Sequence, residues 1–291
     1  EDGIRDKLVT GVQTCALPIS NIGNAGGRIA HLAAGSGWQT TFVLVNTGAS
    51  SASAALRFYD DSGNGLPLPL VFPQGGAPET SAVLTRSIAP GASVWVQSSG
   101  AAGTPLLTGS AQLTTSGNVG GFVIFRYNPN GQEASVPLED RSAGAYLVAF
   151  DNTASIATGI ALSNASSSAI AIPAVVRDDA GTTLGTGSIS LAGNGHAAFV
   201  MATQFPQSAN RRGTIEFDAP SGSAISVLGV RTPPVLTFTT LPPLATIATP
   251  PGDFSASVPG APISVVATAG STLATINFAP DRKSTRLNSS H

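Results

Sequence analysis

An internal duplication constrains the fold of this chain more than any other feature of its sequence. Residues 42–63 (FVLVNTGASSASAALRFYDDSG) and residues 159–181 (GIALSNASSSAIAIPAVVRDDAG) align at an offset of 118, which pairs Asn46 with Asn164. Further along, the offset falls to 104, and near the end of the copy it is 105. The first copy therefore carries an insertion at about residues 71–83. A repeated module of this length predicts that the chain builds one structural unit twice.

Each copy has the pattern of an all-β domain, and we place the copies at residues 28–144 and 145–245. Short segments rich in Val, Ile, Leu, Phe and Thr recur between clusters of Gly, Ser, Asn, Asp and Pro, which is how strands are separated by turns. Seven or eight short strands in about a hundred residues is the size and rhythm of an immunoglobulin-like sandwich. The predicted strands are residues 40–45, 54–59, 68–72, 82–88, 93–97, 107–114, 121–127 and 133–138, then 146–150, 158–162, 170–177, 187–191, 197–201, 214–217, 224–230 and 236–241.

Two further features belong to the expected fold. Alternation sets Leu56 and Phe58 apart from Arg57, which predicts a strand with one buried face. A short turn at residues 203–207 is the best helical candidate. The sequence therefore predicts an all-β chain of two tandem immunoglobulin-like sandwiches.

Both ends of the chain resemble translated sequencing adapter. Residues 1–6 (EDGIRD), 9–19 (VTGVQTCALPI) and 281–291 (DRKSTRLNSSH) each match a stretch of one adapter, in the orientations expected of a read that runs from end to end. Such segments are excluded before fold reasoning. We therefore expect residues 1–20 and 281–291 to be non-native and the genuine part to be a fragment.

Composition excludes several functional classes. Removing the adapter-like ends takes away five of 14 basic and four of 16 acidic residues, which leaves nine against twelve and a net charge of −3. Without a basic patch, binding to a nucleic-acid backbone is disfavoured. The single cysteine, Cys15, lies in an adapter-like end, so neither a disulfide framework nor a thiolate metal site is expected. No apolar stretch of 18 or more residues is present, so no membrane span is predicted.

The second copy is followed by a connector and by a short segment with a family resemblance. Residues 246–258 are rich in Pro, Ala and Thr, which favours a semi-extended linker. Residues 259–280 then resemble the start of a fibronectin type III domain, through the prolines before a first strand at 265–267 and a second strand at 274–278. We expect a truncated N-terminal fragment of such a domain here.

The duplicated module itself resembles a known repeat. Residues 38–46 (WQTTFVLVN), 109–126 (GSAQLTTSGNVGGFVIFR) and 213–216 (GTIE) are similar to a tandem immunoglobulin-like repeat of secreted bacterial proteins, best known from soil acidobacteria. The resemblance implies an exported β-sandwich array, at the cell surface or in the extracellular space. It brings no catalytic residues with it.

A search for catalytic chemistry finds no recognised motif. The sequence lacks a G-x-S-x-G elbow, a Walker sequence, a G-x-G-x-x-G turn opening a helix, and H-E-x-x-H. The two histidines outside the adapter-like ends, His31 and His196, occupy non-equivalent positions in the two copies. Nothing in the sequence brings them to a nucleophile or a carboxylate, so we expect neither an enzyme nor a cofactor.

The repeated aspartate pairs are the main candidates for a metal site. Asp60, Asp61 and Asn64 offer oxygen ligands suited to calcium. The alternative is a hairpin turn in which Asp accepts backbone hydrogen bonds and Gly63 supplies a positive φ. An EF-hand loop starting at Asp60 would need a Glu at its twelfth position, where Val71 stands. We favour the turn.

Aromatic and arginine side chains supply the remaining candidates for a binding site. Trp38 has no aromatic counterpart in copy two and is the candidate for an exposed sugar platform, whereas Trp95 aligns with Phe199, which favours the core. Arg126 and Arg231 align with each other, and we expect each to form an ion pair with Glu133 or with a repeated aspartate pair.

These observations lead to a functional expectation with an alternative. We expect a non-catalytic structural, spacer or adhesion segment of an exported bacterial multidomain protein, whose partner is a protein or a polysaccharide at the cell surface. The alternative is an accessory, carbohydrate-binding region of a secreted hydrolase, which requires Trp38 to be exposed on a flat sheet face. Fold alone does not separate the two, because β-sandwiches carry many unrelated functions.

Overall fold

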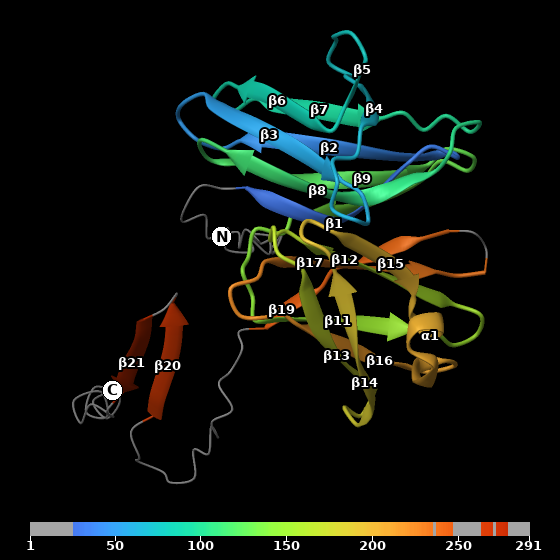
Figure 1. Cartoon of the computed structure of the whole chain (residues 1–291), viewed down its shortest axis with the longest axis vertical. Coiled ribbons are helices and arrows are strands. Elements are labelled where there is room, and N and C mark those ends of the chain that lie inside the picture. The colour runs from blue at the N-terminus through green and yellow to red at the C-terminus, as the bar shows by residue number, and fades with distance from the viewer. Residues whose placement is uncertain (1–25, 235–236, 247–262, 270–271, 279–291) are drawn as a thin grey trace, which may run out of the picture. The chain divides into compact units, whose positions relative to one another are not determined.

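The computed structural model describes residues 26–234, 237–246, 263–269 and 272–278. It shows an all-β chain built from antiparallel sheets, as predicted (Figure 1). The adapter-like ends at 1–20 and 281–291 lie outside the described residues, as does nearly all of the connector at 246–258. In the described part of the chain, no helix is long and apolar enough to cross a membrane.

The first sandwich is formed by two sheets. One has the strand order β1-β8-β3-β6 and the other the order β10-β9-β2-β7-β4-β5. Their bounds are β1 Gly27–Ala34, β2 Trp38–Asn46, β3 Ala52–Tyr59, β4 Leu68–Val71, β5 Glu79–Ser81, β6 Val83–Ile88, β7 Ser93–Ser98, β8 Leu107–Thr115, β9 Val119–Tyr127 and β10 Gln132–Pro137.

The second sandwich repeats the same plan. Its sheets have the orders β14-β13-β16-β11-β19 and β15-β12-β17-β18. The strands are β11 Ala145–Asp151, β12 Ala157–Asn164, β13 Ile170–Asp178, β14 Thr183–Leu191, β15 His196–Val200, β16 Arg212–Asp218, β17 Ile225–Thr232, β18 Thr239–Leu241 and β19 Leu244–Thr246; α1 spans Met201–Gln204 and a 3₁₀ turn spans Pro206–Ser208.

The strand orders show the duplication directly. β11-β16-β13-β14 repeats β1-β8-β3-β6, and β18-β17-β12-β15 repeats β10-β9-β2-β7. Among the described residues β4 and β5 have no counterpart in the second sandwich. β4 ends where the insertion at about residues 71–83 begins, and β5 lies within that insertion. The strand β19, which pairs with β11 over three residues, corresponds in the first sandwich to a single bridge between Arg28 and Glu139.

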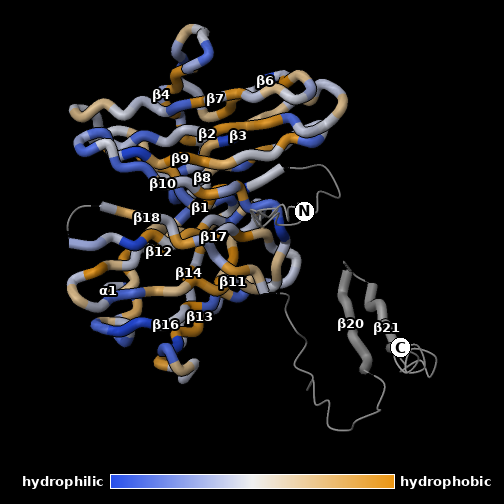
Figure 2. Tube along the Cα trace, turned by 180° about the vertical axis from the view of Figure 1, so that it is seen from behind, coloured by the Kyte–Doolittle hydropathy of each residue, from blue (hydrophilic) through white to orange (hydrophobic). Residues whose placement is uncertain are grey.

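Alternating side chains build a core in each sandwich. Leu56 and Phe58 are buried while Arg57 is exposed, as the sequence pattern predicts. The rings of Phe42 and Phe58 meet across the two sheets with centroids 5.4 Å apart. In the second sandwich Tyr146 and Phe217 are the largest buried side chains. Figure 2 shows the resulting alternation of hydrophobic and hydrophilic residues along the strands.

A strand that the sequence reading missed joins the two sandwiches. β1 lies against β12 and β17 of the second sandwich as well as beside β8 of its own (Figure 1). The hydrophobic core of the first sandwich therefore continues into Ala161, Leu228 and Phe238 of the second. Because this face of β17 is covered too, Ser226 and Leu228 are as buried as Ile225 and Val227.

A separate hairpin follows. β20 (Ile263–Ala269) and β21 (Thr272–Phe278) pair antiparallel, with Ile263 opposite Phe278. The pair belongs to a second compact unit, residues 249–291. Two antiparallel strands agree with the sequence expectation for this segment, and the fibronectin type III assignment itself stays a prediction.

Candidate functional site

The Asp60 turn has the geometry of a capped hairpin turn. The Asp60 carboxylate accepts hydrogen bonds from the backbone amides of Ser62 at 2.9 Å and Asn64 at 2.8 Å. Asp178 accepts the equivalent pair from Ala180 and Thr182, at 2.9 and 2.8 Å. Both bonds to Asp60 end on Oδ1, so this carboxylate oxygen caps the backbone of the turn. Among the described residues no group of three or more His, Cys, Asp or Glu side chains could hold a metal ion.

The neighbouring Asp61 has a different role, because it contacts the other sandwich. Its carboxylate lies 2.7 Å from His196 Nδ1, and its carbonyl accepts a hydrogen bond from the His196 amide at 3.3 Å. Gly63 comes so close to the second sandwich that a Cβ there would lie 1.9 Å from the Gly193 carbonyl oxygen. The turn that suggested a metal loop is therefore part of an interface.

A histidine pair continues this contact. His31 Nδ1 lies 3.1 Å from His196 Nε2, so the order across the interface is Asp61, His196, His31. With the His196 Nδ1–H donating to Asp61, its Nε2 accepts a hydrogen bond from the His31 Nδ1–H. This juxtaposition corrects the sequence expectation that the histidines would lack both a partner and a carboxylate. No sequence signal pointed to it, since 165 residues separate the two histidines.

Burial favours the neutral form of both histidines. Burial, reinforced by the neighbouring His196, lowers the pKa of His31 to about 3. Burial also lowers the pKa of His196, and the hydrogen bond and charge of Asp61 oppose that shift. A neutral pair can share a single proton between the facing nitrogens, whereas two imidazolium ions would repel each other.

Trp38 is not the exposed platform that the sequence suggested. It is half-buried and packs between Tyr127 and Phe238, with ring centroids 4.9 and 5.1 Å away. Phe238 belongs to the segment leading into β18 of the second sandwich, so Trp38 is an interface residue. Aromatic contacts of this kind stabilise an interface beyond the area that they bury.

Trp95 was expected in the core, and the structure corrects this also. It alternates with the fully buried Val96 and is not part of the core cluster. The aligned Phe199 does pack against the core of the second sandwich. The two positions differ because Trp95 lies opposite Val43, whereas Phe199 lies opposite Ile160, the equivalent of Phe42.

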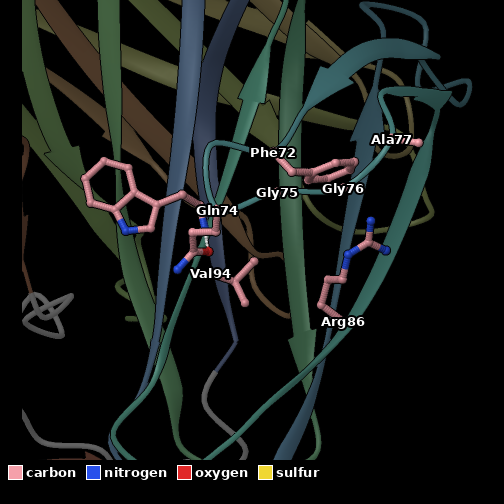
Figure 3. Close-up of a pocket in the computed structure, with 8 residues that line it drawn as sticks. Phe72, Gln74, Gly75, Gly76, Ala77, Arg86 and Val94 are labelled. Atoms are coloured by element: carbon pink, nitrogen blue, oxygen red, sulfur yellow. Dashed lines mark hydrogen bonds between the residues drawn. The ribbon is translucent and has the colours of Figure 1, made fainter.

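A shallow pocket of about 290 Å³ opens beside β7, at the insertion of the first sandwich (Figure 3). The guanidinium of Arg86 stacks over Phe72, 4.6 Å from the ring centroid. The Gln74 side chain bonds the backbone of β7, accepting from the Trp95 amide at 2.9 Å and donating to the Ser93 carbonyl at 3.0 Å. The polar groups of the pocket are thus engaged in holding the insertion against the sheet.

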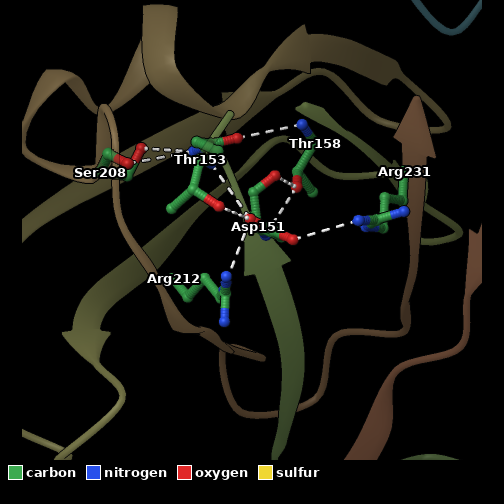
Figure 4. A network of polar contacts seen from close by, with 7 residues as sticks. Asp151, Thr153, Thr158, Ser208, Arg212 and Arg231 are labelled. Atoms are coloured by element: carbon green, nitrogen blue, oxygen red, sulfur yellow. Dashed lines mark hydrogen bonds and ion pairs between the residues drawn. The ribbon is translucent and has the colours of Figure 1, made fainter. Parts of the chain in front are cut away.

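A second polar network centres on Asp151 (Figure 4). Loss of hydration raises the pKa of Asp151, but hydrogen bonds from Thr153 and Arg231 and the charge of Arg212 outweigh it and bring the pKa to about 2. Arg231 lies 3.2 Å from the carboxylate and Arg212 lies 3.4 Å away. Asp151 is thus the partner of Arg231, in place of the repeated aspartate pair that the sequence suggested. Arg126 pairs with Glu133 at 2.8 Å, as expected.

The site with the most unusual surroundings is therefore the contact between the two sandwiches. It joins a buried apolar patch to a polar chain of Asp61, His196 and His31. Further bonds cross it from Gln112 to Asn194 at 3.2 Å and from Gln132 to the Phe238 carbonyl at 2.9 Å. Such an arrangement fixes two domains relative to each other. In comparisons with known proteins, no family model, no curated protein and no solved structure matches this chain.

Proposed function

We propose that the chain is a non-catalytic spacer and interaction segment of an exported bacterial multidomain protein, in which the two sandwiches act as one stiff unit. The observation that carries the proposal is the shared core: Ala161, Leu228 and Phe238 of the second sandwich are 5%, 1% and 7% exposed and belong to the core of the first. Burying one Leu side chain contributes about 1.5–3 kcal/mol, so this contact resists separation of the domains. Export rests on the sequence resemblance.

The connection between the sandwiches supports a stiff unit as well. Glu139 is buried and its carboxylate is held by Arg141 through the backbone amide at 2.8 Å and the guanidinium at 2.8 and 2.7 Å. Its backbone pairs with that of Arg28 in β1, at 2.9 and 2.8 Å. The Tyr146 hydroxyl donates to the Arg141 carbonyl at 3.1 Å, which ties the same segment to β11. A connector anchored on both sides removes the free bending of an ordinary linker.

The alternative of a carbohydrate-binding accessory region required Trp38 on an open face. Trp38 is partly buried and packs between Tyr127 and Phe238, which argues against its use as an open platform for a sugar ring. The same residue instead contributes to the contact that stiffens the spacer.

The proposal is tested by measuring the distance between the sandwiches in solution. Ser53 in β3 and Ala171 in β13 are exposed and occupy equivalent positions, 118 residues apart. Spin labels are attached through Ser53→Cys and Ala171→Cys in a Cys15→Ser background, and their separation is measured by pulsed electron paramagnetic resonance. A stiff unit gives one narrow distance distribution.

Two matched variants distinguish the effect of a substitution in the interface from that of a substitution on the exposed surface. Leu228→Asp places a charge in the shared core and should broaden the distribution several-fold, because a buried unpaired charge is expelled. Val83→Asp alters an exposed position in β6, 42% exposed, and should leave it narrow. A broad distribution in the parent chain would contradict the spacer function.

A further inference from the structure

The outward face of the six-stranded sheet in the first sandwich carries an apolar row. Val43 in β2 lies directly opposite Trp95 in β7 and opposite Phe122 in β9, and directly opposed residues share one face. Val43 is only 3% exposed, but Phe122 is 37% exposed, and Ile124 and Val45 are partly buried on the same face. An apolar row of this kind on an outer sheet face indicates a binding surface.

The second sandwich has the same face, and there it is covered. The buried Asn46 and Asn164 establish the equivalence of the two faces. Asn46 is the third residue after Val43, Asn164 is the third residue after Ala161, and both make the same hydrogen bonds. Leu228 lies opposite Ala161, as Phe122 lies opposite Val43. Ala161 and Leu228 are the residues that enter the core of the first sandwich.

The uncovered face is the more apolar of the two. Where the covered face has Ala161, Ser163 and Leu228, the open face has Val43, Val45 and Phe122. The position of Trp95 is taken by Ala198, opposite Ala161, and Ala198 is exposed. Trp95 therefore stands outside the equivalent contact and does not obstruct it.

The surface that covers such a face is known from the existing contact. β1 of the first sandwich lies against β12 and β17 of the second. Its equivalent in the second sandwich, β11, pairs over three residues with β19, whereas the corresponding edge of β1 makes one bridge, from Arg28 to Glu139. The first sandwich thus has an open β2–β9 face, and the second has a β11 edge that a strand covers, which is the arrangement of repeats in a head-to-tail array.

We propose that the β2–β9 face around Phe122, Ile124 and Val45 docks a further sandwich of this same type, which presents its β1-type strand. The face matches a neutral partner, because Arg126 on it is paired with Glu133 and Gln97 bonds Thr41 at 3.0 Å. The contact is heterologous, because it joins the β1 edge of one sandwich to the β2–β9 face of the next. Each added sandwich therefore repeats the geometry of the one before. The inference rests on the proposed spacer role. It names a partner for the β2–β9 face of the first sandwich, which is separate from the contact between the two sandwiches.

The test extends the full chain by one sandwich. Gly27 is equivalent to Ala145 at the offset of 118, so a second copy of residues 27–144 inserted directly before Gly27 keeps the native spacing. Spin labels are placed at Ser53 of both copies, again in the Cys15→Ser background. Docking predicts the same distance and the same narrow width as the Ser53–Ala171 pair in the parent chain.

Three outcomes decide the matter. Phe122→Asp in the downstream copy should abolish the narrow peak between the copies, while Val83→Asp should preserve it. A broad distribution between the copies, with Ser53–Ala171 still narrow, overturns the docking proposal and leaves the spacer function standing. Retention of the parent chain on an insoluble polysaccharide, lost with Phe122→Ala but not with Val83→Ala, would assign the face to a sugar and also overturn it.

Discussion

Asn46 and Asn164 show how single side chains define the repeated module. Each accepts a hydrogen bond from the amide two residues later, at 2.9 Å, and each donates to two backbone carbonyls at 2.8 Å. Both are fully buried. A buried amide with this many bonds organises the loop after a strand, which explains why the same residue stands at this position in both sandwiches.

Replacing the buried Asn164 side chain should lower the stability of the fold substantially. Asn164→Ala removes three hydrogen bonds, at about 1 kcal/mol each, and leaves buried carbonyls without a donor, so the free energy of unfolding should fall by about 2–4 kcal/mol. Ser167→Ala, in the same loop but exposed, is the matched control and should change it by less than about 0.5 kcal/mol. Urea denaturation measures both, and equal effects would contradict the assigned role of Asn164.

The histidine pair predicts a pH dependence. Because the pKa of His31 is lowered to about 3 from an ordinary value of 6.5, the unfolded chain binds the proton more readily than the folded one. The free energy of unfolding is therefore unaffected by protonation of His31 above about pH 6.5. It decreases as the pH falls from about 6.5 towards 3, by up to about 1.4 kcal/mol per pH unit for one proton.

A variant without the titrating ring isolates this effect. His31→Gln keeps a hydrogen-bond donor but does not titrate, so its unfolding free energy should decline less steeply between pH 6.5 and 4 than that of the parent chain. Denaturation curves at several pH values provide the comparison. Parallel pH profiles for both proteins would remove His31 as the origin of the acid sensitivity.

At the scale of elements, the same turn serves two purposes in the two sandwiches. Gly63 and Gly181 have nearly identical positive φ angles of 83° and 82°. A Cβ on Gly63 would collide with the Gly193 carbonyl, whereas a Cβ on Gly181 would meet no atom within 4 Å. The first turn is an interface element and the second is a free hairpin end.

This pair offers a matched test of the interface. Gly181→Ala should lower stability by about 1 kcal/mol, which is the strain of a left-handed conformation. Gly63→Ala carries the same strain and adds the collision with Gly193, so it should lower stability further and broaden the distance distribution between the sandwiches. Equal losses, with the distribution unchanged, would show that the Gly63 turn does not hold the interface.

The sequence predicted elements well where one face of a strand is buried. Alternation located β3, and the change of offset located the insertion between β4 and β6. β1 escaped because both of its faces are covered, which leaves an Ala-rich segment without alternation. The alignment also placed Arg126 with Arg231, although Arg126 lies opposite Gln39 and Arg231 opposite Thr158, one register position apart.

The candidate site was less predictable than the fold, for a physical reason. The tryptophans were ranked by whether copy two has an aromatic residue at the same place, but a contact between the copies breaks their equivalence. Trp38 is covered by Phe238, and the His31–His196 pair depends on two non-equivalent positions. Periodicity reports which face of a strand is buried and not which domain buries it.

At the scale of the whole molecule, the central claim is that one shared core makes the two sandwiches a single mechanical unit. Three features hold the sandwiches together. They are the apolar contact at Leu228, the polar chain from Asp61 to His31 and the anchored Glu139 segment. Domains coupled in this way unfold together, because opening the contact exposes the core of the first sandwich.

Differential scanning calorimetry of the full chain tests that claim most directly. Coupled sandwiches predict one transition for both, with equal calorimetric and van't Hoff enthalpies, and Leu228→Asp should split it into two. Two separate transitions in the parent chain, unaffected by Leu228→Asp, would show that the sandwiches are independent and would contradict the account.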